Sequence, residues 1–160
     1  MNPGRTTTLE PRHEPLKKLL AYWLEKKGDR RAPGRVDIDP LEIVRLLPHV
    51  IMIDVERSPP RFRYRLVGTE IVKQLGRDLT GRYLDQLEHN PRIDAIAAEY
   101  ARVASWGAPI CATWEYTRDD GRFIRYERLA LPLSSDGKTV DVLFGGTVFD
   151  KAHGGVTASR

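Results

Sequence analysis

Apolar side chains between residues 16 and 24 recur at the spacing of an α-helix. They follow one another every three or four positions, which places them on a single helical face. The members of this apolar stripe are Leu16, Leu19, Leu20, Trp23 and Leu24. Pro15 suits the first helical position and Gly28 the end, so the sequence predicts an amphipathic helix from 15 to 27. The stripe must be buried, either against its own domain or against a second copy of the chain. We expect the second copy, in a homodimer through this helix.

A strict alternation of basic and apolar residues predicts one of the strands. Residues 61–66 read Arg-Phe-Arg-Tyr-Arg-Leu. This period of two is typical of a half-buried antiparallel strand, with Phe62, Tyr64 and Leu66 on its inner face. The apolar run over 50–55 predicts a buried strand just before it.

Helical patterns fill the middle of the chain, and strand patterns follow them. A short helix is predicted between Thr69 and Gly76, and a long one starts at Pro91 and ends at Gly107. Three strand-like segments come next, the first two joined by a turn at 119–121, as in a β-meander. This order predicts an α+β fold: a five-stranded antiparallel sheet with helices on one face, preceded by the N-terminal helix.

Both ends of the chain are poor in large apolar residues. We expect disordered tails over residues 1–14 and 151–160, and a single domain with its N-terminal helix over 15–150. The first fifteen residues lack the continuous apolar run of an export signal, and no apolar run is long enough to cross a bilayer. The single cysteine, Cys111, fits a reducing compartment. We therefore expect a cytoplasmic protein without a membrane partner.

Basic residues exceed acidic ones by four, but the excess is local. Residues 1–36 hold nine Lys and Arg against four Asp and Glu, whereas residues 37–160 hold seventeen against eighteen. A nucleic-acid-binding domain of this size carries its basic residues on one folded face, interleaved with aromatic residues. The body of this chain is nearly neutral, so we expect no nucleic-acid partner.

Several segments resemble a known family of sensor modules. The order of elements is similar to that of the PAS fold. Residues 33–40, 46–48, 62–69 and 76–82 resemble a stand-alone bacterial PAS-like family. Residues 131–137 and 144–147, with Asp150, resemble the last hairpin and closing aspartate of PAS domains. The resemblance runs from about residue 16 to residue 150. It implies a sensory or regulatory module that binds a small molecule or a protein partner.

The same resemblance leaves the cofactor and the output open. PAS domains bind haem, flavins, small organic acids or nothing, so the cofactor is unknown. In linked PAS sensors the closing aspartate leads into a signalling helix, whereas the residues after Asp150 carry no helical pattern. We therefore expect no covalent output domain, and a signal that passes to an unknown protein partner or changes self-association.

The resemblance places a pocket between the inner sheet face and the helices. The candidate ligand-binding residues are Tyr64, Leu66, Leu75, Tyr83, Tyr100, Trp114, Tyr126 and Arg128. Apolar side chains with a few polar groups are typical of small-molecule sites, but also of a filled core. A three-residue loop at 119–121 puts Trp114 and Tyr126 on one face, and a two-residue loop separates them. Arg128, if turned inward, could clamp a carboxylate, whereas arginines on these strands could also form cross-strand ion pairs.

Histidine and cysteine positions give little support to a metal or cofactor site. The four histidines are scattered, and His13 and His153 fall in the expected tails. His49 or His89 could be a lone axial haem ligand, although a polar residue at a loop edge is the simpler role. Cys111 starts a strand and lacks the Asn-Cys-Arg setting of photoactive PAS domains, so we expect a buried small hydrophobe.

No common catalytic motif is present, and we expect no enzyme. The sequence lacks the nucleophile elbow, the P-loop, the dinucleotide-binding glycine pattern and the zinc-protease helix. Two alternatives stay open. One is a cone-shaped α+β isomerase or hydratase, in which an acid faces a tyrosine in a deep cavity, although that fold places its long helices before its strands. The other is a protein-interaction adaptor with an empty core.

Overall fold

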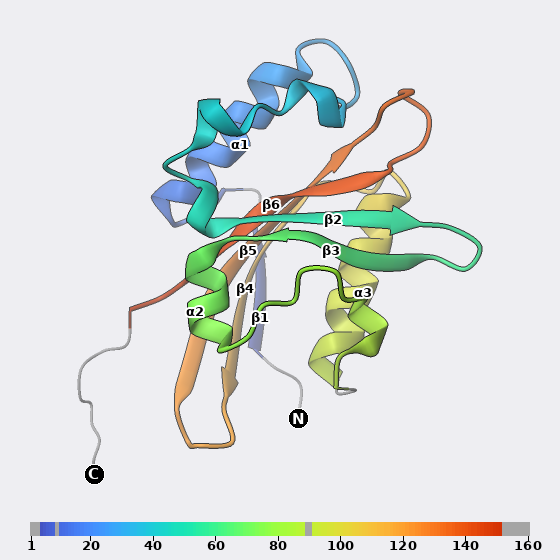
Figure 1. The fold of residues 1–160 in the computed structure, drawn as a ribbon. Helices are drawn as coiled ribbons and strands as arrows, with labels where there is room; N and C mark the ends of the chain where they lie inside the picture. The colour runs from blue at the N-terminus through green and yellow to red at the C-terminus, as the bar shows by residue number, and fades with distance from the viewer. Residues whose placement is uncertain (1–3, 9, 89–90, 152–160) are drawn as a thin grey trace.

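Strands from both halves of the chain pair in one antiparallel sheet of order β1-β4-β5-β6-β2-β3 (Figure 1). The computed structural model describes residues 4–8, 10–88 and 91–151. The strands are β1 (Gly4–Thr8), β2 (Val50–Glu56), β3 (Arg61–Val67), β4 (Ile110–Thr117), β5 (Phe123–Leu133) and β6 (Val142–Phe149). The helices are α1 (Glu14–Lys27), α2 (Thr69–Leu75) and α3 (Pro91–Ala104), with short 3₁₀ turns at η1 (Arg35–Asp37), η2 (Pro40–Ile43), η3 (Leu47–His49) and η4 (Leu84–Gln86).

The five strands and the three main helices of the predicted α+β fold are confirmed, and the sheet has a sixth strand. The prediction of a disordered tail over 1–14 is wrong for Gly4–Thr8, which pairs antiparallel with the otherwise open edge of β4. This segment has no apolar alternation, but its threonines favour strands, and an unpaired edge offers free backbone partners. Of the expected C-terminal tail, residues 152–160 lie outside the described part of the chain.

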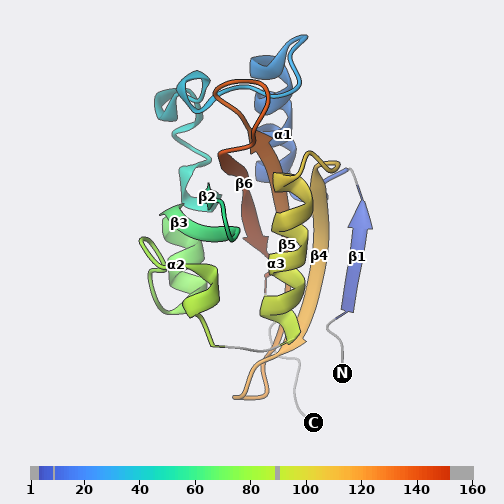
Figure 2. The same cartoon turned by 90° about the vertical axis from the view of Figure 1, so that its right-hand side faces the viewer.

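Helix α1 covers the opposite face of the sheet from α3 (Figure 2). Leu16, Leu19 and Trp23 of its stripe are buried in the same chain, and the Trp23 indole N–H donates a 2.9 Å hydrogen bond to the Pro132 carbonyl. The expectation that this stripe faces a second subunit is therefore wrong for these three residues, while Leu24, at the edge of the stripe, is 51% exposed. The physical reason lies in β5, whose residues from Tyr126 onward are buried on both faces. The face of the sheet opposite α3 must therefore be covered as well, and α1 covers it.

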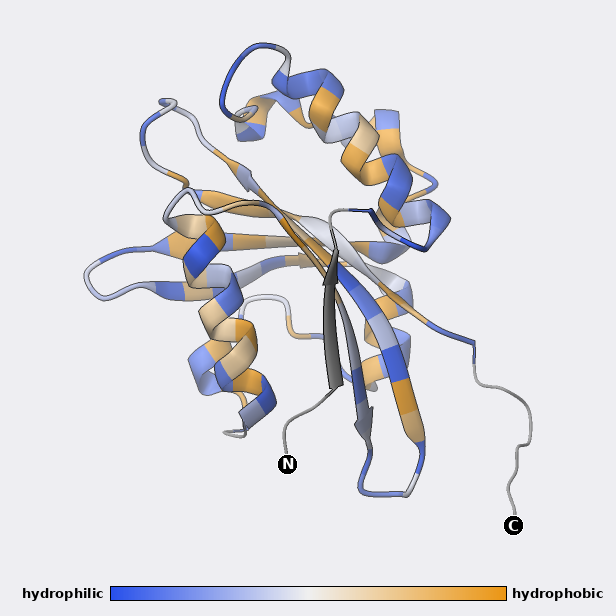
Figure 3. Ribbon diagram, turned by 180° about the vertical axis from the view of Figure 1, so that it is seen from behind, coloured by the Kyte–Doolittle hydropathy of each residue, from blue (hydrophilic) through white to orange (hydrophobic). Residues whose placement is uncertain are grey.

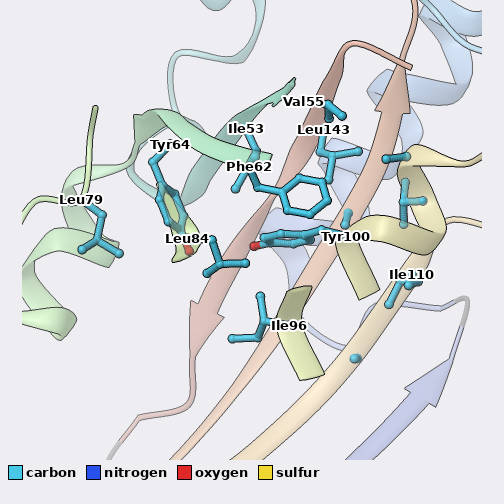
Figure 4. Packing of buried hydrophobic residues seen from close by; sticks show 14 of the residues in the cluster. Ile53, Val55, Phe62, Tyr64, Leu79, Leu84, Ile96, Tyr100, Ile110 and Leu143 are labelled. Carbon is cyan, nitrogen blue, oxygen red and sulfur yellow. The ribbon is translucent and has the colours of Figure 1, made fainter. Parts of the chain in front are cut away.

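Helix α3 and the segment around α2 pack on the inner face of the sheet. The packing there includes an edge-to-face pair between the rings of Phe62 and Tyr100, whose centroids are 5.6 Å apart (Figure 4). Hydrophobic residues run along the centre of the sheet and the facing sides of the helices, while loop ends are hydrophilic (Figure 3). In the described part of the chain, no helix combines the length and apolar character that a membrane span requires.

The hairpin between β4 and β5 fixes which aromatic residues face the inner core. The Arg118 N–H donates to the Arg122 carbonyl at 2.8 Å, which leaves a three-residue loop that ends at Gly121 with φ of +85°. Trp114 therefore pairs with Tyr126 in the register of the two strands. The three-residue alternative is confirmed. Both side chains belong to the inner core, which is the hydrophobic cluster between the sheet and helices α2 and α3.

Candidate functional site

A cavity of about 250 Å³ lies between the inner face of the sheet and helices α2 and α3. Both layers contribute apolar side chains to its wall. These are Ile51, Val67, Ile71, Leu75, Leu79, Leu87, Ile93, Ile96 and Phe149. The polar side chains at the cavity are hydroxyl groups, one amide and four guanidinium groups, from Tyr64, Tyr100, Tyr116, Tyr126, Thr147, Gln74, Arg77, Arg92, Arg118 and Arg128.

Arg128, which belongs to a buried ion pair, forms the polar floor of this cavity. Arg128 on β5 and Glu99 on α3 are 5% and 2% exposed, and the Arg128 guanidinium donates to the Glu99 carboxylate through Nη2. Burial alone would lower the pKa of Arg128, but the neighbouring tyrosines and the Glu99 carboxylate outweigh burial and raise it. The guanidinium therefore stays charged, and the pair ties α3 to the centre of the sheet.

Three tyrosine hydroxyl groups lie close to this ion pair. Tyr126 accepts 3.4 Å hydrogen bonds from the guanidinium groups of both Arg128 and Arg92. Burial raises the pKa of Tyr64 well above its ordinary value and also raises the pKa of Tyr100. The hydroxyl groups of Tyr64 and Tyr100 are therefore neutral at physiological pH and can donate hydrogen bonds to a ligand.

The remaining arginines are less tightly held. The Arg92 guanidinium lies over the Tyr116 ring, with its carbon 4.4 Å from the ring centroid. Arg118 forms a 3.3 Å ion pair with the exposed Asp120 in the β4–β5 loop. Within the described ranges, neither Arg77 nor Arg92 forms an ion pair with a carboxylate. The cavity thus combines apolar walls with more positive charge than its surroundings neutralise.

The comparison with known families agrees with this arrangement. A family model for the PAS domain matches residues 11–148 of the sequence. This chain belongs to the PAS domain family. The resemblance to PAS domains is thereby confirmed. The match covers helices α1, α2 and α3 and strands β2 to β6, except the last residue of β6.

Other comparisons are less informative about this PAS domain. No curated protein matches the sequence. One similar solved structure is that of an RNA-binding Light-Oxygen-Voltage receptor, with 16% sequence identity and a TM-score of 0.49. The match covers 92% of this chain and 39% of the receptor, so this chain spans less than half of the receptor's length.

The PAS fold brings five of the eight candidate ligand-binding residues to the cavity. They are Tyr64, Leu75, Tyr100, Tyr126 and Arg128. Arg128 does turn inward, as the carboxylate-clamp hypothesis requires, but its partner is Glu99 of the same chain. The sequence does not identify this partner, because Glu99 lies 29 positions away on a helix whose clearest signal is its apolar stripe.

Leu66 does not reach the cavity because β3 contains a bulge. The register of β2 with β3 pairs Ile53 with Tyr64 but Met52 with Leu66, which leaves Arg65 as an extra residue. An extra residue reverses the alternation of faces beyond it. Leu66 therefore packs against the outer core, which is the hydrophobic cluster between the sheet and helix α1. Val67 takes the place of Leu66 at the cavity.

Tyr83 and Trp114 also lie outside the cavity wall. The Tyr83 hydroxyl donates a 2.6 Å hydrogen bond to Glu56, and its ring stacks under the Arg61 guanidinium at 3.6 Å. Trp114 is a fully buried core residue, with its ring 5.5 Å from the Arg128 guanidinium carbon. The polar residues that sequence reasoning missed, Gln74, Arg77, Arg92, Arg118 and Thr147, carry no motif that sets them apart from surface residues.

The residues at the cavity do not fit a histidine-ligated haem or a cysteinyl flavin. No histidine or cysteine lines it among the described residues. His49 is half-buried and borders a different surface depression, and His89 lies outside the described residues. Cys111 is buried in the outer core instead. Over the ranges that the structure describes, no cluster of side chains suited to a metal ion was found.

Proposed function

We propose that this chain is a sensory PAS module that binds a small molecule in the cavity between its sheet and helices α2 and α3. The cavity itself carries the proposal, because an ordinary filled core leaves few voids larger than a water molecule. Apolar walls with a few convergent polar groups are typical of small-molecule sites. We place the protein in the cytoplasm, because its single cysteine fits a reducing compartment.

The contacts around the cavity supply a route by which occupancy could change the fold. Helix α3 provides Ile93, Ile96 and Tyr100 to the wall, and the same helix is held to β5 through Glu99. A ligand that moves α3 therefore acts on the ion pair at the centre of the sheet. We propose that a partner protein, or self-association through a surface other than the buried stripe of α1, reads this change.

A sensory role is favoured over catalysis by the state of the buried acid. The isomerase alternative needs an acid that is free to exchange a proton with a substrate. Glu99 is the buried carboxyl group next to the cavity, and it is already engaged by Arg128. We therefore propose that the protein does not turn over its ligand.

An NMR screen of a small-molecule fragment library against the ¹⁵N-labelled protein tests the function. Leu75→Trp fills the cavity from α2, whereas Leu24→Trp makes the same change on the exposed side of α1. We expect ligands that shift amide resonances around the cavity, that fail to bind Leu75→Trp and that still bind Leu24→Trp. A screen without such ligands, or ligands that bind both variants equally, would contradict the proposal and favour an adaptor with an empty core.

A further inference from the structure

The charges at the cavity are strongly one-sided. Four arginines line it, and no Asp or Glu of the described residues does. Glu99 neutralises Arg128 on the floor, and Asp120 pairs with Arg118 on the exposed loop. The two guanidinium groups of Arg77 and Arg92 remain without a carboxylate partner in the described part of the chain. Among the described residues, the cavity wall therefore carries more guanidinium groups than nearby carboxylates neutralise.

Arg92 is the better placed of these two arginines. It is half-buried in the first turn of α3, where the Tyr116 ring holds one face of its guanidinium. Its Nη1 donates to the Tyr126 hydroxyl at 3.4 Å, which uses one of the five N–H donors that a guanidinium carries. A planar group that is stacked in this way loses little freedom when it binds an anion, and its other donors suit a bidentate contact.

We infer that the cavity binds a small organic anion with a compact apolar body, and that Arg92 holds the anionic end beside the Tyr126 hydroxyl. This inference rests on the proposed function, since it names the class of ligand for the same cavity. A ligand without a hydrogen-bond acceptor would remove water from Arg92 without replacing its hydrogen bonds, which is unfavourable. A carboxylate accepts stronger hydrogen bonds from a guanidinium than a neutral oxygen does. The volume of about 250 Å³ lies below that of most drug-sized sites, so the apolar body must be small.

A matched pair of probes separates charge from shape. 3-Phenylpropanoate and 3-phenylpropanamide share one apolar body and differ in the charge of the end group. We expect calorimetric titration to give a Kd for the carboxylate at least about tenfold lower than for the amide, because hydrogen bonds to charged groups are the stronger ones. Arg92→Gln should abolish this preference. Arg102→Gln, on the exposed side of the same helix, should retain it.

The outcomes also separate this inference from the function on which it rests. If the amide binds the cavity as tightly as the carboxylate, or if Arg92→Gln keeps the preference, the anion inference is wrong while ligand binding stands. If neither probe binds at millimolar concentration but other, neutral fragments shift the cavity resonances, the anion inference again fails alone. If no fragment of any charge binds there, both fail.

Discussion

The Nδ1 atom of the His13 imidazole lies 2.8 Å from Oε1 of Glu127. Glu127 is a fully buried residue of β5, and its carboxylate also accepts hydrogen bonds from the backbone N–H groups of Arg12 and His13. On the other side of the ring, Nε2 lies 2.8 Å from Oδ1 of Asp150. His13 therefore joins the start of α1 to the centre of the sheet and to the end of β6.

Glu127→Gln should destabilise the fold more than an ordinary surface change. The glutamine loses the negative charge and turns an amide N–H₂ toward groups that themselves donate hydrogen bonds. We expect the free energy of unfolding in urea to fall by about 3 kcal/mol, as for other broken buried pairs. Glu115→Gln, a partly exposed carboxylate near Arg125 on the neighbouring strand, is the control and should cost less than about 1 kcal/mol. Equal losses would show that Glu127 is not a specific anchor.

The same carboxyl group should make stability depend on pH. Burial alone raises the pKa of Glu127, but hydrogen bonds from Arg12, His13 and Cys111 outweigh burial and leave the pKa below its ordinary value of 4.5. Such a group stabilises the fold above its unfolded pKa, and this contribution is lost as the pH falls through the folded pKa. The melting temperature of the wild type should therefore fall more steeply below about pH 4.5 than that of Glu127→Gln. Parallel curves would refute this link.

Cys111 should be inert in the folded protein. Burial and the nearby Glu127 carboxylate raise the pKa of its thiol to about 12, and only the thiolate reacts readily with disulfide reagents. We expect Ellman's reagent at about pH 8 to label the native protein only as fast as it unfolds, and the denatured protein at once. Rapid labelling without denaturant would mean that the α1 side of the sheet is open.

The Arg128–Glu99 pair should show strong energetic coupling. Arg128→Met leaves the Glu99 carboxylate buried without its guanidinium partner, and we expect a loss of about 3–5 kcal/mol in urea unfolding. Glu99→Met leaves the Arg128 charge buried in the same way. The double variant removes both charges, so it should be more stable than the sum of the two single losses predicts by about 1 kcal/mol or more. Additive losses would show that the two groups do not depend on each other.

Most of the fold could be predicted from the sequence because the patterns that indicate its helices, strands and turns are local. The alternation around Tyr64, the helix start at Pro91 and the loop before Gly121 each depend on a few neighbouring residues. The partner of the α1 stripe could not be predicted, because periodicity shows that a face is buried but not what covers it. Strand β1 was missed for the related reason that backbone pairing at a sheet edge leaves little pattern in the side chains.

The site could be predicted only where the alternation of β-strands is regular. Tyr126 and Arg128 face the cavity because β5 keeps its period of two, whereas the bulge at Arg65 turned Leu66 away. His13 was assigned to a tail, yet it contacts Glu127 and Asp150, which lie more than a hundred residues away in the sequence. Contacts of this kind, and the placement of Arg92 at the cavity, depend on tertiary structure that no local pattern encodes.

The central claim is that a small molecule enters the cavity beneath α2 and α3. Intermolecular NOEs between the protein and bound 3-phenylpropanoate test it most directly. We expect NOEs from the phenyl protons to the methyl groups of Ile71 and Ile96, which line the cavity on two different helices. The account would be contradicted if 3-phenylpropanoate and every fragment of the NMR screen gave NOEs only to exposed apolar residues such as Leu24 or Val44, or none at all.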